Sequence, residues 1–303
     1  MLLPELLLHE LLSVVLAVSP LPSAPRPTPP PPTDRVTILY DAFGGRRGLT
    51  RDWGFAALIE YGGKRILFDT GNNADIFVRN VRALAVDLRR LDFVVVSHRH
   101  GDHTAGLNYL LRVNPHVKIY APKEGFGVFG AALPGTFYRR DSTLPDSMRY
   151  FEAAAPDQLR FGTPWPEANF TWVDSLTEVA PGVAIISTVS KNPGTLELHE
   201  LSLAIRTPAG LVLIVGCSHP GIETILEAAR PWSDHVHLIF GGLHLVTSPD
   251  TTVTRVAAAL HDRWRVDQIA PGHCTGEPAF AALQRLFGAH YVYAGLGTTT
   301  ALP

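Results

Sequence analysis

Short apolar runs recur along the chain from Val36 onward, and glycine or polar residues close each of them. Runs of this length, bounded by turn residues, are typical of strands in a sheet. The stretch "ALIEYGGKRILFD" predicts a hairpin that turns at Gly62 and Gly63, and "LSLAIRTPAGLVLIVG" predicts a second hairpin. Helical and strand-like segments alternate after each hairpin. We therefore expect two α/β halves whose sheets pack against each other.

Composition narrows the class of protein. A chain of 303 residues with 46% hydrophobic residues can bury a sizeable core. The formal net charge of −2 provides no overall attraction to nucleic acid or to acidic membranes, which usually require a basic surface. These features predict a small-molecule substrate, no nucleic-acid partner and no stable membrane insertion. They do not predict an oligomeric state.

The first part of the chain differs from the rest. Residues 1–33 form an apolar stretch and then a proline-rich run, which predicts an extended tail or linker before a single domain over residues 34–303. A secretory signal would begin with basic residues, whereas this stretch carries Glu5 and Glu10. We expect a cytoplasmic protein, with secretion as the alternative if residues 1–24 act as a signal peptide.

The strongest chemical signal is the stretch "SHRHGDHTAGL". Successive side chains of a strand point to opposite faces, so we expect His98 and His100 to share one face and Arg99 to point away. Asp102 and His103 follow, where we expect a turn and the start of a helix. Zinc binds His and Asp side chains, and this spacing is rare by chance, whereas a single histidine is usually structural. The stretch therefore predicts a metal site at the end of a strand, with room for a second ion.

Two ions need ligands from elsewhere, because four side chains from six residues cannot surround both. Three more histidines each follow an apolar run, namely His219 in "GCSHPGI", His244 in "GGLHL" and His273 in "PGHCTG". Strand ends would bring them to one edge of a sheet. Any one of them, taken singly, could instead be a buried structural histidine. Cys217 and Cys274 are too few for a disulfide framework and lie close to histidines, which predicts reduced thiols near a metal.

Together with "LFDTG" ahead of them, these motifs resemble the metallo-β-lactamase superfamily of metal-dependent hydrolases over nearly all of residues 36–302. The resemblance implies an α/β fold, an αββα sandwich of two mixed β-sheets flanked by helices. It implies that Asp69 orients the first ligand segment, that Asp102 binds the second metal and positions the attacking water, and that His273 is the final ligand. The other metal ligands that it implies are His98, His100 and His103.

More narrowly, "GCSHPGI", "GGLHL", "HCTG" and the terminal "GLG" are similar to a branch of the superfamily. This branch is named after 7,8-dihydropterin-6-methyl-4-(β-D-ribofuranosyl)aminobenzene-5'-phosphate synthase. The resemblance implies that His219 and His244 are site residues.

The chain departs from the superfamily at one position. A bridging Asp normally stands in a "GD" at a strand end, where this chain has Gly216 and Cys217. Cys217 could be a thiolate ligand, or a small core residue with His219 in place of the carboxylate. His199 in "ELHELSL" stands near the spacing of the superfamily's middle histidine, although His219 is the stronger candidate. A missing carboxylate bears directly on how the second metal is held.

The predicted function is that of a metallo-hydrolase with a dinuclear site. Metal-activated hydroxide would attack an ester, a phosphoester or a related small molecule, with a pterin- or phosphate-bearing substrate among the candidates. Asp102 would hold the water and His244 would protonate the leaving group. We expect two divalent ions, zinc first, with manganese or iron as alternatives. The alternative functions are a di-iron redox enzyme and a non-catalytic ligand-binding protein on the same fold.

Two groups of residues are candidates for substrate binding. The loop "GGRRGLTRDWG" carries three arginines that could hold an anion through forked hydrogen bonds or could be solvated surface residues: Arg46, Arg47 and Arg51. The region of about residues 122–177 is expected to form loops and short helices over the site. Its aromatic residues could line a pocket for a flat ring or form a small satellite core: Phe126, Phe129, Phe137 and Tyr138.

Overall fold

The computed structural model describes residues 34–124, 131–134, 142–143, 145–146, 149, 153–154, 157–161, 165, 167–192 and 197–303. All the elements below belong to one compact unit, Pro32–Pro303. The tail expected over residues 1–33 and the aromatic residues Phe126, Phe129, Phe137 and Tyr138 lie outside the described residues.

The first sheet has seven strands in the order β15-β1-β2-β3-β4-β5-β8. Neighbours from β15 to β3 are antiparallel and those from β3 to β8 are parallel, so the sheet is mixed. Its strands are β1 (Arg35–Tyr40), β2 (Ala56–Tyr61), β3 (Lys64–Phe68), β4 (Phe93–Val95), β5 (Lys118–Pro122), β8 (Asn169–Val173) and β15 (Thr299–Ala301). The helical segments of this half are α1 (Ala74–Ala83), η1 (Leu88–Arg90), α2 (Gly101–Thr104) and α3 (Leu107–Val113).

The second sheet has six strands in the order β14-β13-β12-β11-β10-β9. Strands β12, β13 and β14 run parallel, and the remaining neighbours are antiparallel. Its strands are β9 (Thr177–Ala180), β10 (Val183–Ser190), β11 (Leu198–Thr207), β12 (Gly210–Val215), β13 (Val236–Gly242) and β14 (Gln268–Gly272). Its helical segments are α4 (Ile222–Ala229), α5 (Asp250–Ala258), η4 (Ala259–Arg263), η5 (His273–Thr275), α6 (Glu277–Phe287) and η6 (Gly288–His290).

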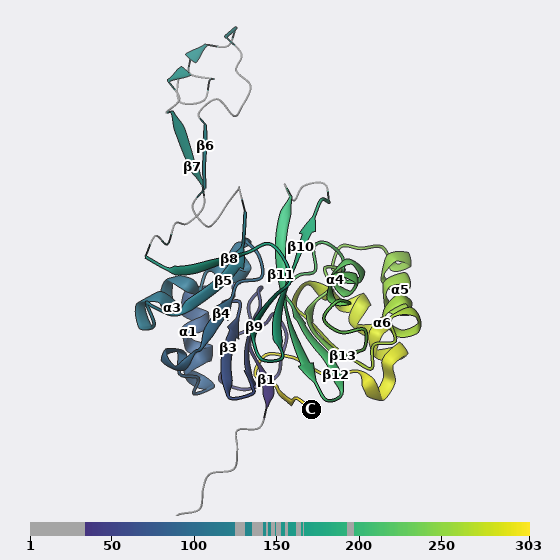
Figure 1. Cartoon of the computed structure of the whole chain (residues 1–303). Helices are drawn as coiled ribbons and strands as arrows, with labels where there is room; N and C mark the ends of the chain where they lie inside the picture. The colour runs from purple at the N-terminus through teal and green to yellow at the C-terminus, as the bar shows by residue number, and fades with distance from the viewer. Residues whose placement is uncertain are drawn as a thin grey trace, which may run out of the picture. The chain divides into compact units, whose positions relative to one another are not determined.

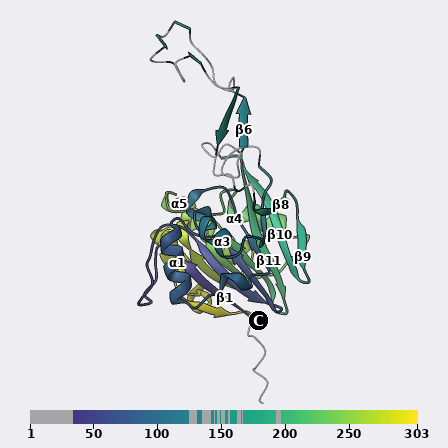
Figure 2. The ribbon, with the colours of Figure 1, turned by 90° about the vertical axis from the view of Figure 1, so that its left-hand side faces the viewer.

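Alternating apolar side chains build the layers. Ile59 and its cross-strand partner Ile66 point into the core between the two sheets. The neighbouring pair, Leu58 and Leu67, points the other way and packs with Phe77 of α1 in the core beneath the helices. Figures 1 and 2 show α1 and α3 covering the outer face of the first sheet, with α4, α5 and α6 covering that of the second. The predicted αββα sandwich is confirmed.

Both predicted hairpins are present. The β2–β3 turn places Gly62 at φ 56° and Gly63 at φ 76°. Two consecutive positive φ angles define the tight turn that matches the twist of paired strands, and glycine adopts them without strain. The second hairpin pairs β11 with β12 from Leu203 opposite Ile214 to Thr207 opposite Gly210.

The expectation of loops and short helices over residues 122–177 holds for some of the described residues there, such as the turn at 142–143, but it missed three strands. Strand β8 extends the first sheet beside β5, and β6 (Ala131–Pro134) pairs with β7 (Gln158–Phe161). The rings of Phe170 and Trp172 stack with centroids 5.0 Å apart, because alternate residues of β8 share a face. The last strand, β15, begins at Thr299 and pairs with β1. Among the described helices, none combines the length and the apolar character needed to cross a membrane.

Candidate metal centre

The histidine-rich loop begins where β4 ends. This strand stops at Val95, so the strand alternation that we expected to align His98 with His100 does not extend to them. The loop is instead held by main-chain bonds on both sides. Val96 N donates to Tyr120 O at 2.8 Å, and Ser97 O accepts from Leu201 N of the other sheet at 2.7 Å. His98 Nε2 and His100 Nδ1 still come within 3.1 Å of each other.

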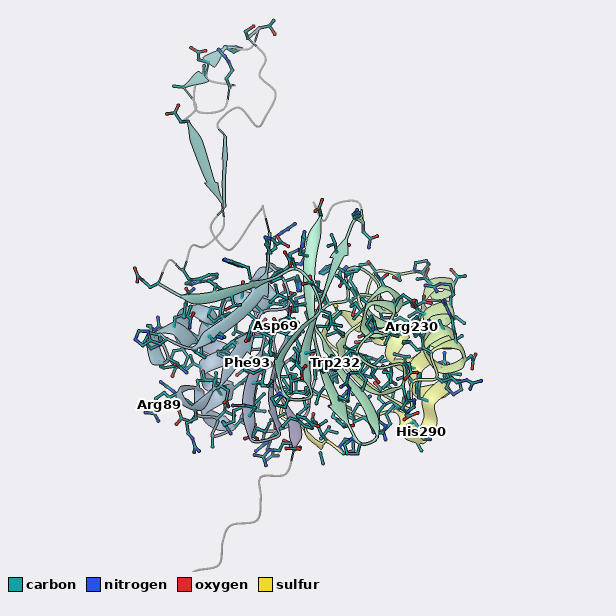
Figure 3. All side chains as sticks on the ribbon, viewed as in Figure 1. Asp69, Arg89, Phe93, Arg230, Trp232 and His290 are labelled. Carbon is teal, nitrogen blue, oxygen red and sulfur yellow. The ribbon has the colours of Figure 1, made fainter. Side chains whose placement is uncertain are left out.

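Asp69 supports this loop from the end of β3. One carboxylate oxygen accepts a hydrogen bond from Ser97 N at 2.7 Å. The other accepts from Ser97 Oγ at 2.7 Å and lies 2.7 Å from His103 Nδ1. Asp69, which is labelled in Figure 3, is fully buried. The contact with Nδ1 fixes the ring of His103 and leaves Nε2 free to face a ligand, which is the usual arrangement behind a metal-binding histidine.

Two groups of donor atoms adjoin each other, and within each group the atoms lie within 4.8 Å. The first group is His98, His100 and His219; the second is Asp102, His103 and His273. In the second group His103 Nε2 lies 3.2 Å from His273 Nε2, which lies 3.4 Å from the Asp102 carboxylate. The structure thus brings together histidines from both halves of the chain.

Cys217 lies between the two groups. Its Sγ is 3.2 Å from His103 Nε2, and it forms donor groups with His98 and His103 and with His219 and His244. At the position where the resemblance implies a bridging carboxylate, this chain has a sulfur atom that adjoins both groups.

Electrostatics keep most of these donors in a form that can bind a cation. Burial holds the pKa of His98 well below its ordinary value, and neighbouring histidines lower it further. Burial and the neighbouring His244 lower the pKa of His219 to about 3. Although burial opposes ionisation, a hydrogen bond with His273 and the charge of His103 lower the pKa of Asp102. Neutral imidazoles and an ionised carboxylate are the forms that coordinate metals.

One further observation indicates that these donor atoms suit a metal ion. His219 Nε2 is buried and lacks a hydrogen-bond partner among the described residues. A buried polar atom without a partner is costly, and this one belongs to a ring whose centroid is 4.9 Å from that of His98. A cation among His98, His100 and His219 would satisfy it.

Glu200 is a site residue that the sequence reasoning missed. It lies in β11, is fully buried, and accepts hydrogen bonds from the backbone N–H groups of Cys217, Ser218 and His219 at 2.9, 2.7 and 2.7 Å. Burial raises the pKa of Glu200 to about 7, although these bonds oppose the rise. Its carboxyl group sets the path of the loop that carries Cys217 and His219. The available signal was an acidic residue inside the apolar run "ELSLAI".

Asp41 supports the backbone of His273 in the same way that Glu200 supports the loop of Cys217 and His219. It lies after β1, is fully buried, and accepts a hydrogen bond from the backbone N–H of His273 at 3.0 Å. Burial raises the pKa of Asp41 to about 8, against the effect of that bond. Trp53 was also missed, and its ring centroid lies 5.2 Å from that of His273.

The backbone is strained around the centre. Asp69, Ser218, His244 and His273 all have left-handed φ angles, of 58°, 63°, 51° and 48°. L-residues seldom adopt this conformation, which costs about 1–3 kcal/mol and often marks functional sites. Half of the eight non-glycine residues with positive φ in the described part of the chain therefore lie here.

The remaining candidates lie at the rim or away from the centre. His244 is exposed, with its ring 4.1 Å from that of His219. Both line a cavity of about 450 Å³ that also involves the start of α4 and part of α5. His199 is not brought into the cluster: its N–H donates to Glu124, and it belongs to none of the donor groups found among the described residues. The three arginines are exposed, namely Arg46, Arg47 and Arg51.

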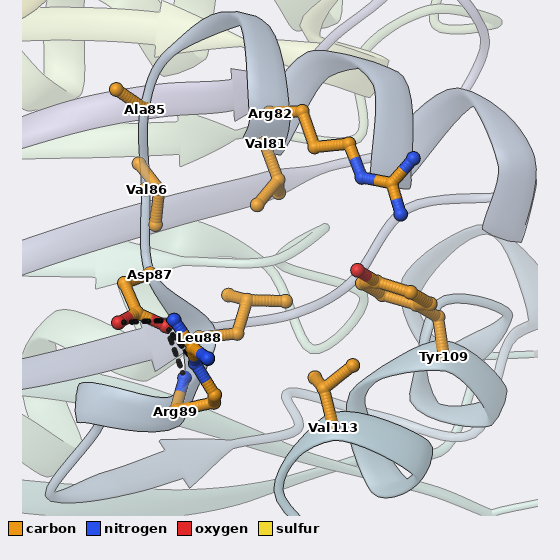
Figure 4. Close-up of a pocket in the computed structure, with 9 residues that line it drawn as sticks. All are labelled: Val81, Arg82, Ala85, Val86, Asp87, Leu88, Arg89, Tyr109 and Val113. Atoms are coloured by element: carbon orange, nitrogen blue, oxygen red, sulfur yellow. Dashed lines mark hydrogen bonds and ion pairs between the residues drawn. The ribbon is translucent and has the colours of Figure 1, made fainter.

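A second cavity, of about 330 Å³, lies between α1, η1 and α3 (Figure 4). Its lining includes Tyr109, Leu88 and Val113. Its carboxylate, Asp87, already accepts two hydrogen bonds from the guanidinium of Arg89, at 2.9 and 3.2 Å. The cavity therefore lacks the free donor atoms of the histidine cluster.

The comparisons with known proteins agree with this architecture. The family model described as the metallo-beta-lactamase superfamily matches residues 49–237, which is more than half of the 303 residues. The chain belongs to the metallo-β-lactamase superfamily. The resemblance expected from the motifs is thereby confirmed.

Within this superfamily, the chain is 28% identical to the 7,8-dihydropterin-6-methyl-4-(β-D-ribofuranosyl)-aminobenzene-5'-phosphate synthase of Methanocaldococcus jannaschii. That match covers 70% of this chain and 76% of the synthase. The crystal structure of Tm1679, a metal-dependent hydrolase of the β-lactamase superfamily, is 25% identical, with a TM-score of 0.67 over 89% of this chain and 99% of that chain. A diphosphatase of the PhnP family shares the fold, at 15% identity, with a TM-score of 0.51 over 89% of this chain and 97% of that chain.

Proposed function

We propose that this metallo-β-lactamase superfamily protein is a metal-dependent hydrolase of small ester or phosphoester substrates. The observation that carries the proposal is the pair of adjoining donor groups, one of His98, His100 and His219 and one of Asp102, His103 and His273. Two divalent ions would be held there, with zinc first and manganese or iron as alternatives, since all three accept His and carboxylate ligands.

Bound divalent ions lower the pKa of water towards neutrality and polarise a carbonyl or phosphoryl oxygen. Asp102 would then orient the attacking water by accepting its hydrogen bond. Its carboxylate is only partly buried, so one side of it remains open to water. His244 would protonate the leaving group from the rim, where its exposed ring lies beside that of His219. No serine or cysteine nucleophile is required.

The substrate is proposed from the surroundings of these residues. The cavity beside His219 and His244 has room for a small molecule. The loop that carries Arg46, Arg47 and Arg51 also carries Trp53, whose ring centroid lies 5.2 Å from that of His273. We therefore propose that these exposed arginines hold an anionic group of the substrate. Because the related synthase is named for a phosphorylated pterin compound, phosphate- and pterin-bearing molecules are the first substrates to test.

The experiment is metal analysis of the purified full chain, followed by assays with phosphodiesters, phosphomonoesters and lactones. We expect zinc or manganese and turnover of at least one substrate. Asp102→Ala should abolish that turnover, whereas Asp87→Ala, which removes a carboxylate paired with Arg89 away from the centre, should preserve it. A protein that binds iron with a redox-active spectrum and hydrolyses none of these substrates would favour the di-iron alternative.

A further inference from the structure

The two cysteines of the chain meet at the metal centre. They stand at positions 217 and 274, and each is a buried free thiol. Cys217 follows β12 and Cys274 lies in η5, after β14. Because β12, β13 and β14 are parallel, their carboxyl ends meet at one edge of the sheet. The two sulfur atoms and a ring nitrogen of His273 lie within 4.8 Å of one another.

The local backbone holds this arrangement. The backbone N–H of Cys217 donates a hydrogen bond to the Glu200 carboxylate at 2.9 Å. The Cys274 thiol donates to Cys217 O, with an S–O distance of 3.6 Å. Gly242 leaves room for the second sulfur, since a Cβ atom at that position would lie 2.7 Å from Cys274 Sγ. A close approach of this kind requires the absence of a side chain at residue 242.

The surroundings of Cys217 are those of a ligand, and Cys274 belongs with it and His273 to one donor group. Cys217 Sγ lies 3.2 Å from His103 Nε2, an atom that also faces His273 Nε2 at 3.2 Å. A cysteine that serves only as a small apolar residue packs among apolar side chains. Thiolates bind zinc strongly, and a coordinating thiol loses its proton to solvent when the metal binds.

We propose that Cys274, together with Cys217 and His273, is a ligand of the metal centre, which gives one face of the centre two sulfur donors. This goes beyond the ligand set that we expected, in which Cys217 was the sole sulfur. Thiolates are soft donors that favour zinc and disfavour manganese and magnesium, whose usual ligands are oxygen atoms. The inference rests on the metal centre of the proposed function and does not depend on turnover.

The test is X-ray absorption at the zinc edge of the full chain loaded with zinc, with the zinc content per chain measured in parallel. Zinc–sulfur scattering is expected at about 2.3 Å. The decisive sample is Cys217→Ser, in which Cys274 is the one remaining thiol, so zinc–sulfur scattering there must come from Cys274. Cys274→Ser should weaken the sulfur signal of the wild type, and the double variant should lose it. Cys217→Asn should give the same scattering as Cys217→Ser.

Cobalt provides a second readout that does not depend on zinc scattering. Cobalt-loaded wild type should show sulfur-to-metal charge-transfer absorption that Cys274→Ser and Cys274→Ala reduce and the double variant abolishes. Circular dichroism should show that the variants are folded. The zinc affinity of Cys274→Ser relative to its manganese affinity should fall on the order of tenfold or more, because a soft donor is lost.

Two results would overturn the inference: a sulfur signal in wild type that Cys274→Ser leaves unchanged, or its complete loss in a folded, zinc-loaded Cys217→Ser. If the single variants do not fold, the number of sulfur atoms in the wild-type scattering decides, because two per chain support the inference and one or none contradicts it. A protein with the two-sulfur signature that hydrolyses no substrate would contradict the proposed function and leave this inference intact. A protein that hydrolyses a substrate but lacks the two-sulfur signature would support the proposed function and contradict this inference.

Discussion

Asp69 makes three contacts at the base of the centre, two with Ser97 and one with His103. Asp69→Asn should keep the size of the side chain but lose the charge that holds the Nδ1–H of His103. We expect metal affinity to fall roughly 10- to 100-fold, as is usual when a partner behind a ligand is changed. Calorimetric titration with zinc measures this. Asp87→Asn, at an exposed pair with Arg89, is the control, and equal affinities for both variants would argue against the assignment.

Glu200 accepts three backbone hydrogen bonds in a fully buried position. Glu200→Ala would leave those N–H groups without partners, at a cost of about 1–3 kcal/mol each, so we expect the free energy of unfolding to fall by about 3 kcal/mol. Denaturant titration measures the change. Glu178→Ala, at an exposed position, should change stability by less than about 0.5 kcal/mol.

Because the carboxyl group of Asp41 is buried, we expect the stability of the metal-free protein to depend on pH. Burial raises its pKa from 3.8 to about 8. A carboxyl group with a raised pKa in the folded state stabilises the fold below its unfolded pKa, and this contribution is lost as pH rises towards 8. The stability of wild type relative to Asp41→Asn should therefore decline between about pH 4 and pH 8. Denaturant titrations of both proteins across this range measure it, and a constant difference would contradict the prediction.

Much of the candidate site could be predicted at the residue scale, because the candidate ligands cluster in sequence or end apolar runs. His98, His100, Asp102 and His103 share one short stretch. The supporting contacts could not be predicted in the same way. Asp41 meets His273 across 232 positions of the chain, and no local pattern reveals a pairing at that separation.

At the scale of elements, two loops approach closely beside the centre. Gly216 precedes Cys217, and a Cβ atom there would lie 2.3 Å from Ser97 Oγ. Gly216→Ala should push the Cys217 loop away from the His98 loop and weaken zinc binding about tenfold or more, through displacement of ligands. Gly45→Ala is the matched control, since its Cβ would meet nothing within 4 Å. Zinc titration compares the two, and equal affinities would exclude a tight fit at residue 216.

The elements themselves followed from hydrophobic period and turn residues. The hairpins at Gly62 and Gly63 and at the β11–β12 turn are local features, so the sequence sufficed to predict them. Strand β8 was missed because "NFTWV" is short and follows a region rich in aromatic residues, glycine and proline. It pairs with β5, a strand some fifty residues earlier. This pairing depends on tertiary context, namely the free edge of β5, which the local sequence does not reveal.

At the scale of the domain, candidate ligands from both halves converge. His98 to His103 belong to the first half, and His219 and His273 to the second. A metal ion held by both halves binds the folded state alone, so saturating zinc should raise the free energy of unfolding by about 4 kcal/mol at a thousandfold excess over Kd. Calorimetry with zinc and with a chelator measures the difference. Identical melting temperatures would contradict a centre shared by the two halves.

The main-chain bond from Leu201 to Ser97 joins the two sheets directly beneath the ligand loop. To separate the sheets there, the protein would have to break this bond and expose the buried Asp69 carboxylate. Access for an incoming molecule should therefore depend on rotation of the exposed side chains Trp53 and His244, with the framework beneath them remaining still.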